Sequence, residues 1–312
     1  MLTTIRHIDA GELRAFAEFA ACEDRGFAPA APAEFETWLK SLWQSGHSSP
    51  SKCFLAETDG EPLAAVVYWL RGNRAHAEHM RLPTGAEQLL DRLLTESLSQ
   101  LRADGIVSVW AELPTPPLRE PRGGILAACL ERIGFGMGRE RLTFLWKTCD
   151  GAVESPLRLT FRSLAELGRD AFLAALAEMT ADSLDAGIAC ERETKGPARY
   201  AADLFADEVL TRHEDSWWEI GYDHTGDAVG IALAGVVGRQ PAVQFVAVHP
   251  RHRGQGYSRD LLRRGISKLR STGAESVRGD VDLANTPMVK AFRAVGFREV
   301  RSCRQFEWEF LS

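Results

Sequence analysis

The sequence predicts an α+β protein made of two similar domains in tandem. Its 312 residues exceed what one hydrophobic core usually organises. Short segments of the first half recur in the same order in the second half. Each half also alternates strand patterns with helix patterns in one shared order. We therefore expect two domains, residues 1–150 and 156–312, each a mixed, mostly antiparallel sheet flanked by helices.

The internal repeat rests on several matches. Thr4–Ile8 recurs as Thr160–Leu164, and Gly134-Phe135 recurs as Gly296-Phe297. Between them, a leucine pair, a Leu-Arg pair and a glycine follow one another in both halves. Any single match could arise by chance, but their shared order favours a duplication.

Each half is expected to begin with a strand and a helical region, followed by a hairpin and a further strand. In the first half these segments are 2–8, 10–45, 52–58, 62–71 and 75–82. In the second half they are 157–164, 165–212, 216–222, 228–236 and 242–248. Asp59-Gly60 and Thr225–Asp227 supply the hairpin turns. An amphipathic helix comes next, and a strand, a short helix and two more strands complete each half.

Composition excludes several classes of protein. A net charge of −6 argues against a general nucleic-acid binder, and no stretch approaches the ~20 apolar residues of a membrane span. The N-terminus lacks a signal-peptide pattern. The six cysteines stand singly, without the paired spacing of a zinc site or a dense disulfide scaffold. We expect a reduced, cytoplasmic protein with no metal, no nucleic acid and no membrane as a partner.

The segment that carries chemistry lies between an apolar strand and the second amphipathic helix. The strand pattern Val243–Val248 leads into Arg251–Ser258, which contains Gly254 and Gly256. A glycine-rich turn at a helix N-terminus suits an anion, because free N–H groups and the helix dipole both point there. A simple tight turn with solvated arginines is the alternative, but the strand, the helix and the arginines together favour an anion site. The segment matches neither a Walker loop nor a dinucleotide fingerprint.

These residues resemble the GNAT acyltransferase superfamily. Val248-x-Pro250-x-x-Arg253-Gly254-x-Gly256-x-Ser258 follows its acyl-CoA loop, with Ser258 where Gly or Ala is usual. Asn285-Thr286-Pro287-Met288 and the later Gly296-Phe297 follow its second cofactor segment. Two such domains in one chain resemble the architecture of mycothiol-synthase-type proteins, although no motif identifies the acceptor.

The resemblance implies acetyl-CoA as co-substrate. The strand at 243–248 would splay from its neighbour at 275–281, and its backbone would bind the pantetheine arm. Amides around Gly254 would hold the diphosphate, while the amine of an acceptor attacks the thioester directly. The residues expected to bind the cofactor are Val246, Ala247, Val248, Arg253, Gly254, Gln255, Gly256, Tyr257, Ser258, Asn285 and Phe292.

Two departures from the family concern the catalytic groups. Phe292 stands where the family often has a tyrosine as general acid, and its alternative role is a core aromatic. The strand at 242–248 lacks the usual acidic base, and Gln244 is its nearest polar group. Glu219 and Asp280 are the candidate catalytic residues, with Asp282 as a further substitute and bulk water as a proton relay.

The acceptor is expected to be an amine of a small molecule or a peptide. Asp182, Asp185, Glu191 and Glu193 would give its groove an acidic lining that suits a cation, or would form a solubilising loop. The equivalent loop of the first half, 81–87, has one glycine, so we expect that half to be degenerate. The competing function is a non-catalytic acyl-CoA-binding or sensing protein, and the oligomeric state is not predicted.

Overall fold

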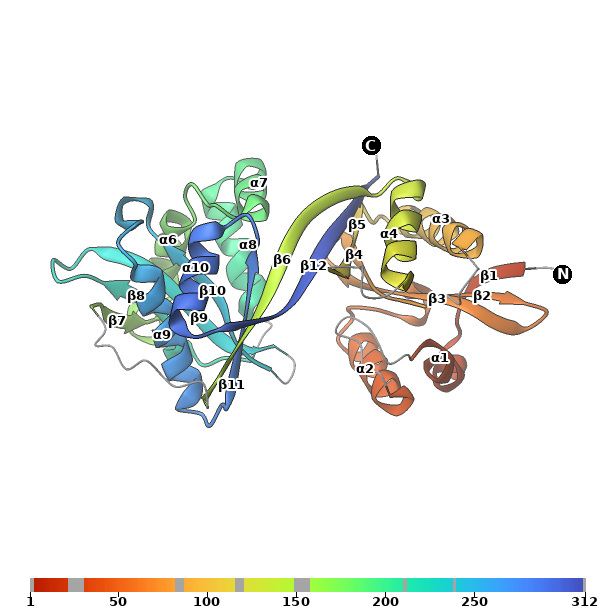
Figure 1. Ribbon diagram of the computed structural model, residues 1–312, viewed down its shortest axis with the longest axis horizontal. Coiled ribbons are helices and arrows are strands. Elements are labelled where there is room, and N and C mark those ends of the chain that lie inside the picture. The colour runs from red at the N-terminus through yellow and green to blue at the C-terminus, as the bar shows by residue number, and fades with distance from the viewer. Residues whose placement is uncertain are drawn as a thin grey trace. The chain divides into compact units, whose positions relative to one another are not determined.

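The chain forms two compact units. One contains Met1–Arg139 with Cys303–Ser312, and the other contains Glu140–Ser302 (Figure 1). The computed structural model describes residues 3–21, 31–81, 87–115, 121–148, 158–209, 212–237 and 240–310. The equivalent loop of the first half and the join between the repeats therefore lie largely outside the described residues, as do Cys22 and Cys149.

Unit 1, Met1–Arg139 with Cys303–Ser312, is built on a sheet with the strand order β1-β2-β3-β4-β5-β12. The strands from β1 to β4 pair antiparallel, and β4 pairs with β5 in parallel. Asp59 and Gly60 both have positive φ in the β2–β3 turn (52° and 85°), as a tight hairpin requires. The strands are β1 (Thr3–His7), β2 (Cys53–Thr58), β3 (Glu61–Arg71), β4 (Arg74–Arg81), β5 (Ser108–Thr115) and β12 (Arg298–Glu309).

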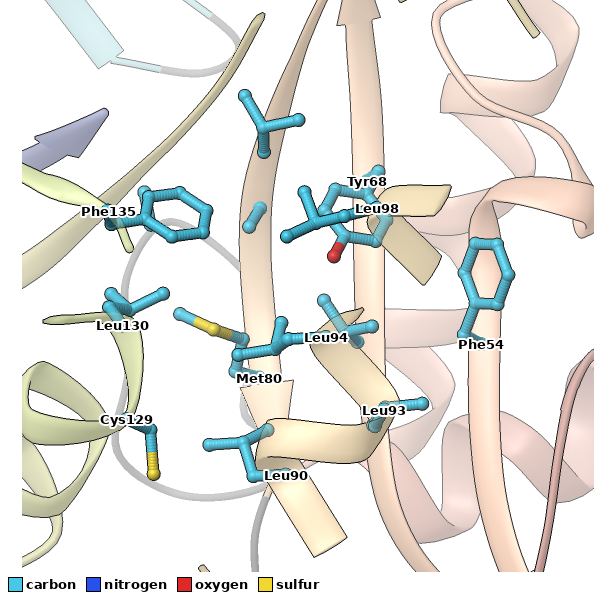
Figure 2. Packing of buried hydrophobic residues seen from close by; sticks show 14 of the residues in the cluster. Phe54, Tyr68, Met80, Leu90, Leu93, Leu94, Leu98, Cys129, Leu130 and Phe135 are labelled. Atoms are coloured by element: carbon cyan, nitrogen blue, oxygen red, sulfur yellow. The ribbon is translucent and has the colours of Figure 1, made fainter. Parts of the chain in front are cut away.

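Helices cover the two faces of the unit 1 sheet. On one face the apolar stripe of α3 packs with α4 over Tyr68 and Met80 (Figure 2). On the other face α1 and α2 bury Phe16 and Phe35 against the sheet. Alternate strand residues thus enter different cores, which is why the strands read as mostly apolar. The helices are α1 (Leu13–Ala20), α2 (Pro32–Gln44), α3 (Glu87–Ala103) and α4 (Pro121–Ile133).

Unit 2, Glu140–Ser302, repeats this plan with the strand order β6-β11-β10-β9-β8-β7. β10 and β11 pair in parallel, and the other pairings are antiparallel. The strands are β6 (Gly136–Lys147), β7 (Thr160–Ser163), β8 (Trp218–Tyr222), β9 (Ala228–Val237), β10 (Gln240–Val248) and β11 (Ser276–Asp282). The expected α+β class, with mixed and mostly antiparallel strand pairing in each unit, is confirmed.

Two helical layers flank the unit 2 sheet. α9 and α10 pack with Val243 and Val281 on one face. On the opposite face α6 and α8 bury Phe172 and Phe205 against Trp218. The helices are α5 (Leu164–Leu167), α6 (Arg169–Met179), α7 (Ala186–Lys195), α8 (Pro197–Val209), α9 (Tyr257–Arg270) and α10 (Thr286–Val295). Among the described helices, none is both long and apolar enough to cross a membrane.

The end of each repeat differs from the expectation. In place of two final strands, each half ends in one long strand, β6 or β12. Both strands run across a unit boundary, at 139/140 and at 302/303. Each unit therefore completes its sheet with a strand that the repeat assigns to the other half. Neither glycine nor proline occurs between Arg139 and Lys147, and this uninterrupted run of strand residues fits one continuous strand.

We predict that Gly279→Ala destabilises the protein by about 1–3 kcal/mol through overpacking. A Cβ on Gly279 would clash with the ring of Phe292, which stacks on Phe144 in the core. Gly279 does not have positive φ, so the cost comes from the contact and not from the backbone. Denaturant unfolding measures the effect, and Gly124→Ala, which meets nothing within 4 Å, is the matched control.

The double variant Gly279→Ala with Phe292→Leu should be more stable than the sum of the single effects, because the smaller side chain relieves the clash. Additive effects would show that the two residues are not in contact.

Candidate functional site

The site is organised by the way β10 leaves β11. The parallel register between these strands consists of one described pair, Ala242 with Arg278. Directly afterwards β10 contains a bulge, because Val243 and Phe245 face consecutive residues of β9. Gln244 is the extra residue, and the strand bends away there. The splay that the resemblance implied is therefore present in unit 2.

The splay leaves one backbone edge of β10 without a strand partner among the described residues. The N–H of His249 donates to Val229 of β9 at 2.8 Å. Because backbone groups alternate along a strand, the N–H groups of Val246 and Val248 face the opposite edge, toward β11. Their side chains are partly buried against α9. This edge can donate and accept hydrogen bonds to an extended ligand that lies between the strands.

The glycine loop follows β10 and ends at the N-terminus of α9. Gly254 and Gly256 have φ of +78° and +82°, a conformation that side chains with a Cβ rarely adopt. A Cβ on Gly254 would meet nothing within 4 Å, so the space beside this loop is open. The free N–H groups of a 14-residue helix adjoin it. Backbone and space together fit a phosphate group.

An arginine that the sequence did not single out stabilises this loop. Arg158 donates to the carbonyl of Gln255 at 3.0 Å and to the buried carboxylate of Asp260 at 2.7 Å. Its guanidinium also lies over the ring of Tyr257, 4.5 Å from the centroid. The charge of Arg158 offsets an acid in the first turn of α9, where an anionic ligand would otherwise be repelled. An isolated arginine before a strand carries no recognisable signal in the sequence.

The side chain of Arg253 is turned away from the glycine loop. Its guanidinium donates to three backbone carbonyls, those of Val248 at 3.1 Å and of Ala181 and Asp182 at 2.6 Å each. Any contribution of Arg253 to a cofactor would therefore come from its backbone.

Two further expected cofactor residues have structural partners. The Asn285 side chain caps α10 by accepting from the N–H of Met288 at 3.3 Å. Phe292 is 3% exposed and packs between Phe144 and Phe297. This burial favours the core role of Phe292 over contact with a ligand.

Glu219 on β8 is a buried carboxylate fixed by two cations of α9. Arg264 donates to both of its oxygens, at 2.6 and 2.8 Å, and Lys268 lies 3.0 Å from one of them. These hydrogen bonds raise the pKa of Arg264 above its ordinary value. Both oxygens of Glu219 are thus engaged by cations of α9. The arrangement attaches α9 to the sheet.

The two acids of β11 have different surroundings. Asp280 accepts from the hydroxyl of Thr143 at 2.6 Å and pairs with Arg278 at 2.9 Å. Asp282 is 2% exposed, and one of its oxygens accepts from the N–H of Ala284 at 2.9 Å. The other oxygen is buried without a hydrogen-bond partner. Burying a carboxylate oxygen without a hydrogen-bond partner costs free energy, and such a group calls for an explanation. We therefore take Asp282 as the strongest catalytic candidate among the described acids of unit 2.

Only some of the acidic side chains of residues 182–193, after α6, are available to line an acceptor groove. Asp185 caps α7 by accepting from the N–H of Ile188 at 3.1 Å, and Glu191 pairs with Lys195 at 2.9 Å. Leu184 in the same segment is 52% exposed. The lining that this segment offers is thus less acidic and more apolar than its composition indicates. The described residues contain no cluster of three or more His, Cys, Asp or Glu that could hold a metal ion.

Comparison with known proteins agrees with this geometry. Residues 181–297 match the model of the acetyltransferase (GNAT) family. The chain is 28% identical over 263 residues to a mycothiol acetyltransferase of Thermobispora bispora, covering 78% of this chain and 79% of the relative. It is 24% identical over 284 residues to a mycothiol acetyltransferase of Clavibacter sepedonicus, covering 89% and 87%.

Solved structures share the whole fold. A GCN5-related N-acetyltransferase from Sphaerobacter thermophilus superposes with a TM-score of 0.70 at 16% identity, covering 98% of this chain and 95% of that one. A tandem GNAT protein from the clavulanic acid biosynthesis pathway, solved without AcCoA, gives 0.57 at 15% identity and covers both chains fully. The resemblance to tandem GNAT acetyltransferases is confirmed.

We predict that Glu219→Gln lowers the free energy of unfolding by about 2–4 kcal/mol, because Arg264 and Lys268 lose a partly buried counter-ion. Thermal or denaturant unfolding measures this. The matched control is Glu299→Gln, whose pair with Arg293 is exposed (side chains 41% and 58%) and should cost at most about 0.5 kcal/mol. Unchanged stability with lost turnover would instead identify Glu219 as a catalytic base.

Proposed function

We propose that this tandem GNAT-type N-acetyltransferase transfers an acetyl group from acetyl-CoA to an amine in unit 2, between β10 and β11. The splay of these strands carries the proposal, because it leaves a backbone edge beside a glycine loop and a helix N-terminus. The first half lacks the paired glycines of that loop and would serve a structural role.

The residues of unit 2 fit coenzyme A in three places. Amides of Gly254–Ser258 would hold the diphosphate, and the exposed Arg251 adds positive charge beside them. The outward N–H groups of Val246 and Val248 would bind the pantetheine arm. One of them would donate to the thioester oxygen, which gains negative charge when the acceptor attacks. Asn285 lies at the start of α10, after β11, and could reach the arm from the other strand.

The chemistry needs a deprotonated amine. When acetyl-CoA is bound, the amine nitrogen attacks the thioester carbon and the carbon–sulfur bond breaks. We assign Asp282 as the group that accepts the amine proton, directly or through one water, because its unpartnered oxygen lies at the end of β11 where the strands diverge. The thiol of the product has an ordinary pKa of about 8.5, so solvent can protonate the thiolate without a dedicated acid.

The acceptor would approach from the face opposite α9. Phe245 and Ala247 of β10 lie on that face with α6, and the segment between α6 and α7 follows directly. With Leu184 and Leu283 both exposed, an amine with an apolar body fits better than a strongly cationic peptide. The relatives are named for mycothiol, so mycothiol-derived amines belong in the first acceptor panel with simple primary amines.

We predict that Gly254→Ala weakens acetyl-CoA binding by more than tenfold, about 1.4 kcal/mol. The new methyl group would enter the open space of the loop and strain its positive φ. Calorimetry measures the affinity. Gly226→Ala is the matched control, because Gly226 also has positive φ and open space but lies in the β8–β9 turn. Equal affinity in both variants would remove the loop from the cofactor site.

We further predict that Asp282→Asn lowers kcat by about 10²- to 10⁴-fold while acetyl-CoA affinity stays within about twofold. Thiol release measures turnover with the acceptor panel. Asp280→Asn is the control, because both oxygens of Asp280 already have partners and the variant should retain most of its turnover. A larger loss in Asp280→Asn than in Asp282→Asn would reverse the assignment.

A further inference from the structure

We infer that Arg253 is a positioning residue for the acceptor, which links the acceptor-side segment of unit 2 to the strand that holds acetyl-CoA. This inference rests on the proposed function of the same site. The side chain of Arg253 then does not bind phosphate, although its place in the glycine loop suggests that role.

The contacts of Arg253 span two parts of the site. Its Nε donates to the carbonyl of Val248, the last residue of β10, at 3.1 Å. Its two terminal nitrogens donate to the carbonyls of Ala181 and Asp182 at 2.6 Å each. A guanidinium presents donors in a rigid planar fork, and here that fork is matched by carbonyls from two chain segments. A phosphate could bind the Arg253 side chain only by breaking these hydrogen bonds.

The segment that Arg253 holds contains a left-handed turn residue. Asp182 has a φ of +47°, one of two described non-glycine residues with positive φ. Few non-glycine residues adopt this conformation, and aspartate is among those that do so most readily. Arg192 of α7 donates to the carbonyl of Ala177 and to the Thr180 hydroxyl. Arg192 thus fixes the end of α6, while Arg253 fixes the turn that follows.

The position of this segment explains its relation to the acceptor. α6 packs on the face of the sheet that carries Phe245 and Ala247, whereas α9 and the glycine loop adjoin the other face. A cofactor that enters from the side of α9 leaves the opposite face of the splay for the amine. Residues 180–185 begin where α6 ends and are tied to the end of β10. They therefore border the path by which an amine reaches the thioester.

The arrangement has a consequence for both substrates. The carbonyl of Val248 lies next to the N–H that would hold the pantetheine arm, so one side chain sets the strand end and the acceptor segment together. Displacement of an acceptor by about 1 Å can cost a large factor in rate, on the order of a hundredfold. Loss of Arg253 should therefore affect the acceptor more than acetyl-CoA.

The test compares Arg253→Met with Arg251→Met, which removes the same charge from the same loop. Arg251 is exposed, whereas the guanidinium of Arg253 is bound to three backbone carbonyls. We expect Arg253→Met to lower kcat/KM for the acceptor on the order of tenfold or more, with the acetyl-CoA Kd within about threefold. Arg251→Met should instead raise the acetyl-CoA Kd and leave kcat/KM for the acceptor nearly unchanged. Arg253→Lys should restore little, because one ammonium cannot replace the planar fork.

A second measurement does not depend on turnover. Amide hydrogen exchange of residues 180–185 should accelerate in Arg253→Met and not in Arg251→Met. If the native protein releases no thiol with any amine, the proposed function fails. The exchange result still tests whether Arg253 holds residues 180–185 in place. If Arg253→Met weakens acetyl-CoA as much as Arg251→Met does, with exchange of 180–185 unchanged, the inference is overturned.

Discussion

The site depends on one constraint, the loss of strand pairing between β10 and β11 after Ala242 and Arg278. An unpaired strand edge is costly when buried, and proteins usually cover it. Here the bulge at Gln244 bends β10 so that this edge borders the glycine loop and the start of α9. The same backbone feature thus creates room for an extended ligand and supplies the hydrogen-bonding groups to hold it.

The charges around α9 are arranged so that its N-terminus stays available to an anion. Arg264 and Lys268 of α9 bind Glu219 of β8 and so attach the helix to the sheet. Arg158 binds Asp260 in the first turn. Each of these two buried carboxylates has its cation, as the cost of burying a lone charge requires. The helix is therefore fixed by side chains whose hydrogen bonds do not involve the amide N–H groups of Gly254, Gln255 and Gly256.

Much of the fold could be predicted because it rests on local patterns. Strand alternation and turn glycines placed the strands from β1 to β4 and from β7 to β10 within a few residues of their observed bounds, whereas the helical regions 10–45 and 165–212 were not divided into their helices. The loop from Arg251 to Ser258 carried the resemblance to the GNAT superfamily. The use of β6 and β12 across the unit boundaries could not be predicted, because a strand pattern does not say which sheet edge it will join. The partners of Arg253 and Glu219 also escaped prediction. Both contacts join residues more than 40 positions apart.

Both repeats contain a bulge at the equivalent position, but the residue at the bulge differs. In unit 1, Glu78 is the extra residue opposite Val67 and Tyr68 of β3, at the position that Gln244 takes in unit 2. The Glu78 side chain is 5% exposed, and it accepts from Trp69 at 3.0 Å and lies 2.6 Å from His76. A carboxylate at the bulge is therefore compatible with this fold when neighbours hold it. Unit 2 has the glycine loop and an uncharged amide at its bulge, so the bulge supplies no carboxylate there, and the proton acceptor that we propose, Asp282, lies on β11.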